Sequence, residues 1–391
     1  MSCINNARKA HMNVLLGRVF AFSLLCSLLV VLGTQSAYAA TKDTNPLIQY
    51  PLLQNPGGIR GVEGSPGTTY SNIPWRRIGY PTCGWTDFTG DTLKHVIQNY
   101  HDHGISVLLV VCQPKPSDLF NMQLLNDAAQ GGADAVQCGN EQMKVDDPSV
   151  SFLYVPPDKF ARFFDLCQRA VHAVNPQTVT TMGSLDPHVG GIDVAPLQQQ
   201  VSYLDQMQAA MNTTVHPGGH WNWRTQTLGL IDTWHNGYPT DATNSLYHLF
   251  QFWAARFGVS LEAGQLGHHL WVVESTGCFR GCGVDPNNNQ QVAIVHVLSL
   301  ITNAQTAMRY GIPHFFFSGK DFISVGIKWP IGLLDLNGND KPLRQDLPMG
   351  ARTLNMNCAG QTVPVQTQED LLARLYLGCS LPGNYRTILM S

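Results

Sequence analysis

The sequence has few charged residues: Asp, Glu, Lys and Arg make up only 13% of its 391 residues. It also has no basic excess, with 24 Lys and Arg against 27 Asp and Glu, whereas nucleic-acid binding proteins use such an excess to contact phosphates. At 44% hydrophobic residues, it is too apolar for a disordered protein. These proportions indicate a folded protein with a large core and no nucleic-acid partner.

Long hydrophobic runs are also scarce. The run from Val19 to Gly33 is roughly 15 residues, shorter than the roughly 20 that span a bilayer. Basic but no acidic residues precede it, and it is followed by Ala37-Tyr38-Ala39, which suits signal peptidase. Residues 1–39 are therefore predicted to be a secretory signal peptide, and the mature chain to be extracellular without a stable membrane span. Because the region before the run is long, a retained signal anchor is the alternative.

The chain has ten cysteines, of which Cys3 and Cys26 lie in the predicted signal. The even number that remains permits full pairing in an exported protein. A Cys278–Cys282 disulfide would stiffen its loop, and Cys358–Cys379 would pin the C-terminal tail. A zinc site made from these four thiols is the alternative, although Cys-x3-Cys is not a tight metal spacing. The spacing leaves open the partners of Cys83, Cys112, Cys138 and Cys167.

Short apolar, β-branched runs recur along the chain, with helical periodicity between them. Near-continuous apolar strands indicate a parallel sheet buried on both faces, and eight of them with intervening helices indicate a (β/α)8 barrel. The connection after the first expected strand is too short for a crossover helix, which leaves the position of that strand open. The expected strands are Ile59–Glu63, Arg77–Tyr80, Ile105–Cys112, Ala133–Gly139, Val179–Gly183, Leu228–Ile231, Leu270–Val273 and His314–Phe317.

Helices are expected where apolar residues recur with a period near 3.6. The clearest example lies between Pro156-Pro157 and Asn175-Pro176, which are start and stop signals. Its apolar positions are Phe160, Phe163, Phe164, Cys167, Val171 and Val174. Asp241–Phe257 and Gln290–Met308 show the same pattern.

The predicted organisation has three parts. Residues 1–39 form the signal, residues 40–356 the barrel with an irregular N-terminal lead-in, and residues 357–391 a short C-terminal appendage stapled by a disulfide. The fold class is thus α/β.

Two of the expected strands end in a carboxylate. Ala133–Gly139 continues into Asn140-Glu141, and Leu270–Val273 continues into Glu274. In a parallel barrel the functional groups lie at the carboxyl ends of the strands. Either glutamate alone could cap a helix or pair with a basic neighbour. Together they suit glycoside hydrolysis, in which one carboxyl group protonates the leaving oxygen and the other, ionised, attacks or activates water.

With these motifs, the sequence resembles the clan A glycoside hydrolases, a (β/α)8 superfamily in which strand four ends in Asn-Glu and strand seven in Glu. The resemblance extends from about Arg77 to Leu354. It implies that Glu141 is the acid/base, Glu274 the nucleophile of a retaining double displacement on a β-linked glycan, and that Asn140 binds the sugar 2-hydroxyl. No cofactor is implied, and the two carboxyl groups are expected about 5 to 5.5 Å apart.

The resemblance implies further substrate-binding residues. Arg77 matches the arginine that holds the nucleophile ionised, although Arg76 beside it leaves the register open. His235 and Tyr238 resemble a His-x-Tyr segment with one extra residue between them, so that bracing their loop is the alternative role.

Aromatic side chains near strand ends could stack on sugar faces. Trp234 is the foremost candidate, and Trp85, Trp221, Trp223 and Phe317 are the others. Phe315–Lys320 stands where many members of the clan carry a tryptophan, which leaves the particular family open.

Two rival functions remain. A catalytically silent barrel that binds a glycan or a protein would not need both Glu141 and Glu274. A metal-assisted hydrolase could use His101 with His103 or His268 with His269, but both pairs precede strands, away from the face where barrel sites lie, and are interpreted as structural. No Gly-x-Gly-x-x-Gly, phosphate loop or Gly-x-Ser-x-Gly motif is present.

Overall fold

In the computed structural model, all helices and strands described below belong to residues 45–391. The described residues are 59–63, 74–84, 88–143, 154–185, 194–226, 229–232, 246–275, 292–293, 306–307, 309–324, 327–329, 332, 334–339, 354–365, 374, 377–379 and 385–386.

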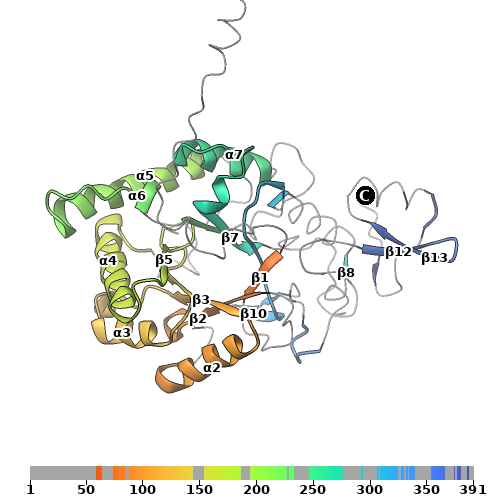
Figure 1. Cartoon of the computed structure of the whole chain (residues 1–391), viewed down its shortest axis with the longest axis horizontal. Coiled ribbons are helices and arrows are strands. Elements are labelled where there is room, and N and C mark those ends of the chain that lie inside the picture. Colours follow the sequence, from red (N-terminus) through yellow and green to blue (C-terminus); the bar gives the residue numbers. More distant parts are fainter. Residues whose placement is uncertain are drawn as a thin grey trace, which may run out of the picture. The chain divides into compact units, whose positions relative to one another are not determined.

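The main sheet has eight strands in the order β5-β4-β3-β2-β1-β9-β7-β6, and every pair in it is parallel. Its two end strands, β5 and β6, lie next to each other, so the sheet curls into a barrel (Figure 1). This confirms the predicted α/β barrel and all eight expected strands. The strands are β1 Ile59–Glu63, β2 Trp75–Gly79, β3 Ser106–Val111, β4 Ala135–Cys138, β5 Val179–Met182, β6 Gly229–Asp232, β7 Leu270–Ser275 and β9 His314–Phe316.

The position of the first strand, which the sequence left open, is settled by its neighbours. In β1, Gly61 is aligned with Trp75 of β2, and Ile59 with His314 of β9. β1 therefore fills the place between the second and the last strand of the barrel.

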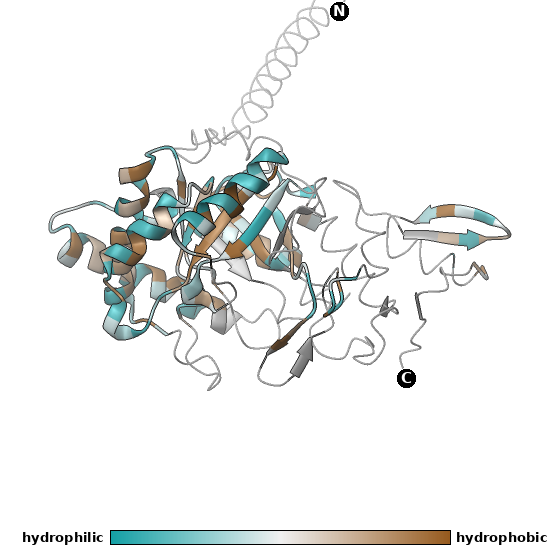
Figure 2. Cartoon of the chain, turned by 90° about the horizontal axis from the view of Figure 1, so that it is seen from below, coloured by the Kyte–Doolittle hydropathy of each residue, from teal (hydrophilic) through white to brown (hydrophobic). Residues whose placement is uncertain are grey.

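Helices lie around the outside of these strands (Figure 1). They carry hydrophilic as well as hydrophobic residues (Figure 2), as helices with one buried side do. The α-helices are α2 Gly90–Asp102, α3 Met122–Gln130, α4 Pro157–Val174, α5 Val194–Ala210, α6 Trp223–Gln226 and α7 Leu246–Phe257; the short 3₁₀ helices are η3 Pro81–Cys83, η4 Pro116–Asp118 and η9 Leu266–His268, and η6 Met211–Val215 is a π-helical turn.

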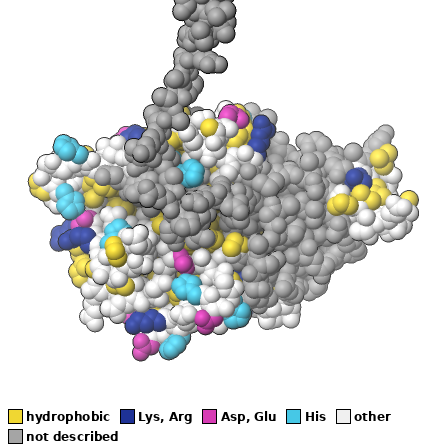
Figure 3. All heavy atoms as spheres, viewed as in Figure 1, with side chains coloured by type: hydrophobic (Ala, Val, Ile, Leu, Met, Phe, Trp, Pro, Cys, Tyr) yellow, Lys and Arg dark blue, Asp and Glu magenta, His cyan; other side chains and the backbone are white. Residues whose placement is uncertain are grey.

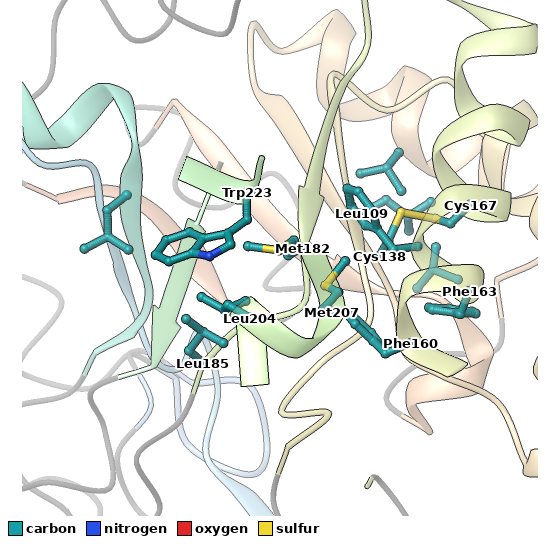
Figure 4. Close-up of a cluster of buried hydrophobic side chains, with 14 of the residues drawn as sticks. Leu109, Cys138, Phe160, Phe163, Cys167, Met182, Leu185, Leu204, Met207 and Trp223 are labelled. Atoms are coloured by element: carbon teal, nitrogen blue, oxygen red, sulfur yellow. A yellow bond between two sulfur atoms is a disulfide. The ribbon is translucent and has the colours of Figure 1, made fainter. Parts of the chain in front are cut away.

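Helix α4 confirms the clearest of the predicted helices. It starts with Pro157 at its first position and ends at Val174, before Asn175-Pro176. Its apolar positions are buried except Val174, which is 50% exposed because it lies in the last turn. The buried ones pack against the outer side of β4 and the neighbouring helices (Figure 4).

Three disulfides lie within the described residues. Cys83–Cys112 connects the segments that follow β2 and β3, and Cys138–Cys167 joins the end of β4 to α4 (Figure 4). Cys358–Cys379 confirms the predicted staple of the C-terminal tail. Cys278 and Cys282 lie outside the described residues.

The barrel interior is filled by large aromatic residues. Trp271 of β7 stacks on Phe315 of β9 with ring centroids 6.0 Å apart, and Trp75 of β2 meets Trp271 edge to face at 5.6 Å. All three are buried together with small and aliphatic residues from β3, β4, β5 and β7. Because this plug fills the barrel, a ligand site can form only at an end of the strands.

The helix expected over Gln290–Met308 is wrong at its beginning. Val292–Ala293 forms strand β8, which pairs in parallel with β14, Tyr385–Arg386. Pairing with a segment that is distant in the sequence overrides the local helical periodicity here. β14 itself lies in the predicted C-terminal appendage, residues 357–391.

The remaining strands form two antiparallel hairpins. β10 Phe322–Ser324 pairs with β11 Ile327–Trp329, and β12 Leu354–Cys358 pairs with β13 Gln361–Val365. Within the described part of the chain, no helix is long and apolar enough to cross a bilayer.

His314 of β9 makes stability depend on pH. It is fully buried, none of the described residues hydrogen-bonds to its ring, and burial lowers its pKa from 6.5 to about 4. The lowered pKa means that the His314 imidazole binds a proton more tightly in the unfolded chain than in the folded one. We therefore expect about 3 kcal/mol of stability to be present above pH 6.5 and lost as the pH falls to 4. Urea unfolding across this range should show a flatter pH dependence for His314→Leu. The exposed His220→Gln control should keep the wild-type slope, and an unchanged slope in His314→Leu would contradict the prediction.

Candidate active site at the carboxyl end of the barrel

Arg77 of β2 connects the ends of two other strands of the barrel, β4 and β7. Its side chain is fully buried and donates from Nη1 to Glu274 Oε1 at 2.5 Å, from Nη2 to Asn140 Oδ1 at 2.8 Å and from Nε to Gln137 Oε1 at 3.0 Å. Trp75, two residues earlier in β2, belongs to the interior plug, so alternation along the strand directs Arg77 into the barrel as well. Arg76 points to the other side, where its guanidinium lies over the Tyr100 ring at 5.9 Å. Of the two arginines, it is thus Arg77 that contacts Glu274 and Asn140.

Glu274 reaches the site through an irregularity in β7. Leu270 and Val272 belong to the outer core, and Trp271 and Val273 to the interior plug. Strict alternation would therefore turn Glu274 outward. The register shifts at this point against both neighbouring strands, which is the sign of a β-bulge. The extra residue lets Glu274 face Arg77 as a 3% exposed carboxylate with a buried counter-ion.

Asn140 is held by hydrogen bonds on its side chain and its backbone. Its Oδ1 accepts from Arg77, from Gln137 Nε2 at 2.9 Å and from Ser184 Oγ at 2.8 Å. Its backbone N–H donates to Gln113 Oε1, and its carbonyl accepts from Gln113 Nε2, both at 2.9 Å. With Oδ1 saturated, the Nδ2 group is the part of the amide that remains for a ligand, since no acceptor for it is found among the described residues.

Glu141 directly follows Asn140 and is 7% exposed. Its backbone has φ 45°, the left-handed region that residues other than glycine rarely adopt. Such a conformation persists only where the surroundings impose it. Here the two hydrogen bonds between the Gln113 side chain and the Asn140 backbone hold the residue before Glu141 in place, and Gly139 allows the chain to turn just before it.

Gly139 is required by both its conformation and its surroundings. It has φ 99°, and a Cβ at this position would lie 2.6 Å from Cε2 of Phe160 in α4. We expect Gly139→Ala to lower the free energy of unfolding by about 2 to 5 kcal/mol, from backbone strain plus overpacking.

Gly132→Ala is the matched control, because Gly132 has φ 80° but nothing within 4 Å of its Cβ position. It should cost only the strain, about 1 to 2 kcal/mol. Urea unfolding of the two variants measures the difference, and equal losses would show that the contact with Phe160 is unimportant.

Only some of the remaining predicted residues belong to the described part of the chain. Trp234, His235 and Tyr238, like Trp85, lie outside the described residues. Phe317 follows β9, is 9% exposed and packs edge to face on Phe322 at 5.5 Å; the Phe317–Ser318 peptide is cis.

Two of the aromatic candidates pack among the helices. Trp223 is wrong as a sugar-stacking candidate, because it is fully buried between Trp253 and Phe257. Trp221, partly buried, packs on Phe164 of α4.

The paired histidines belong to local structure. His101 Nε2 lies 2.9 Å from Asp134 Oδ2 beside β4, and His103 Nδ1 lies 2.7 Å from the Asn99 carbonyl at the end of α2. His268 ends the short helix η9 before β7. Among the described residues, no group of three or more His, Cys, Asp or Glu side chains could hold a metal ion.

Gln137, Gln113 and Ser184 are parts of the site that the sequence did not reveal. All three are buried polar residues, and each donates to or accepts from Asn140. Gln137 interrupts an otherwise apolar strand on the same face as Ala135, and this polar inward position is the signal that could have identified it. Gln113 and Ser184 follow the ends of β3 and β5, where polar residues also occur without function.

The arrangement places the Glu274 carboxyl group on β7 and a second carboxyl group beside Asn140, after the end of β4, and one guanidinium bonds to both strand ends. Such a pair can attack an electrophilic carbon and move a proton. On the described part of the face in Figure 3, Lys and Arg side chains are scattered among acidic ones rather than gathered in a patch.

Neither a known protein family nor a curated protein matches the sequence. Similar solved structures include a glucosidase from Croceicoccus marinus at 11% identity and TM-score 0.46, covering 73% of this chain and 65% of the glucosidase. A β-mannanase from Thermomonospora fusca in complex with mannohexaose matches at 13% identity and TM-score 0.44, over 75% of this chain and 89% of the mannanase. A β-glucuronidase from Bacteroides uniformis matches at 10% and 0.47, over 77% of this chain and 36% of the glucuronidase. The chain thus spans less than two thirds of two of these proteins.

Proposed function

We propose that the chain is a secreted, retaining glycoside hydrolase that cleaves β-linked O-glycosidic bonds of a poly- or oligosaccharide. The observation that carries the proposal is the Arg77 guanidinium, which donates both to Glu274 of β7 and to Asn140, the residue before Glu141. One buried cation thereby brings together the two strand ends that bear carboxyl groups. Paired carboxyl groups at the mouth of a barrel are what glycoside hydrolysis requires.

The proposed reaction has two steps. In the first, the Glu274 carboxylate attacks the anomeric carbon while Glu141 gives its proton to the leaving oxygen, so that a glycosyl ester forms and the aglycone leaves as an alcohol. In the second, Glu141 takes a proton from water, the water oxygen bonds to the anomeric carbon, and Glu274 is released as a carboxylate. Two inversions give net retention, and no cofactor takes part.

Other side chains are proposed to bind the sugar. Asn140 Nδ2 donates to the 2-hydroxyl, because its Oδ1 is already occupied by three donors. Trp234 and Phe317 are proposed to stack on sugar faces, and His235 and Tyr238 to bind hydroxyl groups.

Export is part of the proposal. Three disulfides in the described residues support an oxidising compartment. We propose that residues 1–39 are the signal, residues 40–356 the catalytic barrel and residues 357–391 the stapled appendage.

The test is release of reducing sugar from a panel that includes cellulose, mannan, galactan and xylan, together with their oligosaccharides and aryl β-glycosides. We expect release from at least one substrate, and none from the Glu141→Gln/Glu274→Gln double variant purified in the same way. A wild-type protein that binds a glycan but releases nothing would favour the silent barrel. A chelator should have no effect on release, whereas inhibition would favour metal-assisted hydrolysis.

A further inference from the structure

Gln137 is a fully buried polar residue in the wall of the barrel, and its amide is fully used. Its Oε1 accepts from Arg77 Nε at 3.0 Å, and its Nε2 donates to Asn140 Oδ1 and to the Gly139 carbonyl, each at 2.9 Å. Both hydrogens and the oxygen of this side chain therefore have partners within the site.

The orientation of the amide follows from its partners. Arginine only donates, so the atom of Gln137 that faces Nε is the oxygen. Asn140 presents to Gln137 the same oxygen that accepts from Arg77 Nη2, so Gln137 must present its nitrogen there. A glutamine satisfies all of these contacts. A carboxylate would instead place an acceptor oxygen next to two other acceptors, Asn140 Oδ1 and the Gly139 carbonyl oxygen.

These contacts fix the plane of the Arg77 guanidinium. Nε and Nη2 lie on one edge of the planar group, and this edge is taken by Gln137 and Asn140. The remaining nitrogen, Nη1, then points at Glu274. Gln137 thus acts on the carboxylate of β7 through Arg77, and on the residue beside Glu141 through Asn140.

We propose that Gln137 is a positioning residue that must be neutral: it directs Arg77 Nη1 to the nucleophile and turns the Asn140 amide nitrogen toward the substrate. This inference rests on the proposed function. A carboxylate at position 137 is nearly the same size but would compete with Glu274 for the guanidinium and add a negative charge beside it.

Three variants test the proposal. Gln137→Glu is expected to lower kcat by about 100-fold or more with a smaller change in KM, and to move the acidic side of the pH–rate profile to higher pH, because the added charge favours protonation of the carboxyl groups around Arg77. Gln137→Met, which removes the hydrogen bonds without adding charge, should lower kcat by about 10-fold or more without shifting the pH–rate profile.

Gln200→Glu is the matched control: Gln200 of α5 is 2% exposed, and none of the described residues hydrogen-bonds to its side chain. It should lower stability but leave the pH profile unchanged.

The outcomes separate the two proposals. If the wild-type protein is active and both Gln137 variants keep the wild-type kcat and pH profile, the positioning role of Gln137 is overturned. The proposed glycosidase activity is then unaffected. A crystal structure of Gln137→Met tests positioning even without activity. We expect the guanidinium plane to turn and the Nη1–Glu274 contact to lengthen, and an unmoved Arg77 would overturn the inference.

Discussion

Glu274→Gln is expected to lower kcat by about 10⁴-fold or more, because an amide cannot form the glycosyl ester. The fold should persist, since the amide oxygen of glutamine still accepts from Arg77 Nη1. Glu262→Gln is the matched control, because Glu262 is exposed and lies after α7; it should keep wild-type kcat. Hydrolysis rates on the best substrate of the panel, with circular dichroism of each variant, measure the effect. Glu274→Gln with more than a tenth of wild-type kcat would show that this carboxylate is not the nucleophile.

Glu141→Gln tests the proposed acid/base role of Glu141 separately from the nucleophile role of Glu274. Its loss of rate should be large on natural glycans but small for the first step on 2,4-dinitrophenyl glycosides, because such a leaving group needs no protonation. Glu274→Gln should be slow on both substrates. A uniform loss on both substrates in Glu141→Gln would contradict its role as the acid.

Arg77→Met is expected to lower the free energy of unfolding by about 3 to 5 kcal/mol, because it leaves the 3% exposed Glu274 as a buried charge without its cation. Asn140 Oδ1 and Gln137 Oε1 also lose a donor. Activity should fall by about 100-fold or more, because the nucleophile and Asn140 are no longer held together. Urea unfolding and kcat on the same preparations measure the two effects.

Two further variants control this prediction. Arg76→Met removes the neighbouring buried arginine, which faces the other side of β2, and should destabilise the fold while leaving kcat of the folded fraction near wild type. In the double variant Arg77→Met/Glu274→Gln the buried charge is gone, so the combined destabilisation should be smaller than the sum of the single losses by about 1 to 3 kcal/mol. Additive losses would show that the ion pair is not the reason for the instability of Arg77→Met.

The strands of the barrel could be predicted because each is a short apolar run that must be buried on both faces. Even the first strand was placed correctly, although its short connection to Trp75 argued against it. The prediction of a helix was wrong at Val292–Ala293 because strand β8 depends on pairing with Tyr385–Arg386. Local hydrophobic periodicity carries no information about pairing with such a distant segment. The pairs Cys83–Cys112 and Cys138–Cys167 depend on the packed fold, and spacing alone leaves several connectivities.

The candidate site could be predicted from the sequence where its residues lie at strand ends. Asn140, Glu141 and Glu274 directly follow or end apolar runs, and the structure brings Asn140 and Glu274 to one guanidinium. The sequence could not decide between Arg76 and Arg77, because adjacent residues of a strand face opposite sides and the structure is needed to show which side faces the barrel interior. The bulge that turns Glu274 inward has no sequence signal, since it is visible only as a register shift against β6 and β9.

The proposed role of Glu274 as the nucleophile of a retaining glycosidase is tested most directly by trapping the glycosyl–enzyme. The wild-type protein is incubated with a 2-deoxy-2-fluoro glycoside of the sugar that the panel identifies, digested, and mapped by mass spectrometry. We expect one glycosyl adduct, on the peptide that contains Glu274, and none in Glu274→Gln. An adduct on another residue, or inversion of the anomeric centre during turnover without any adduct, would contradict it.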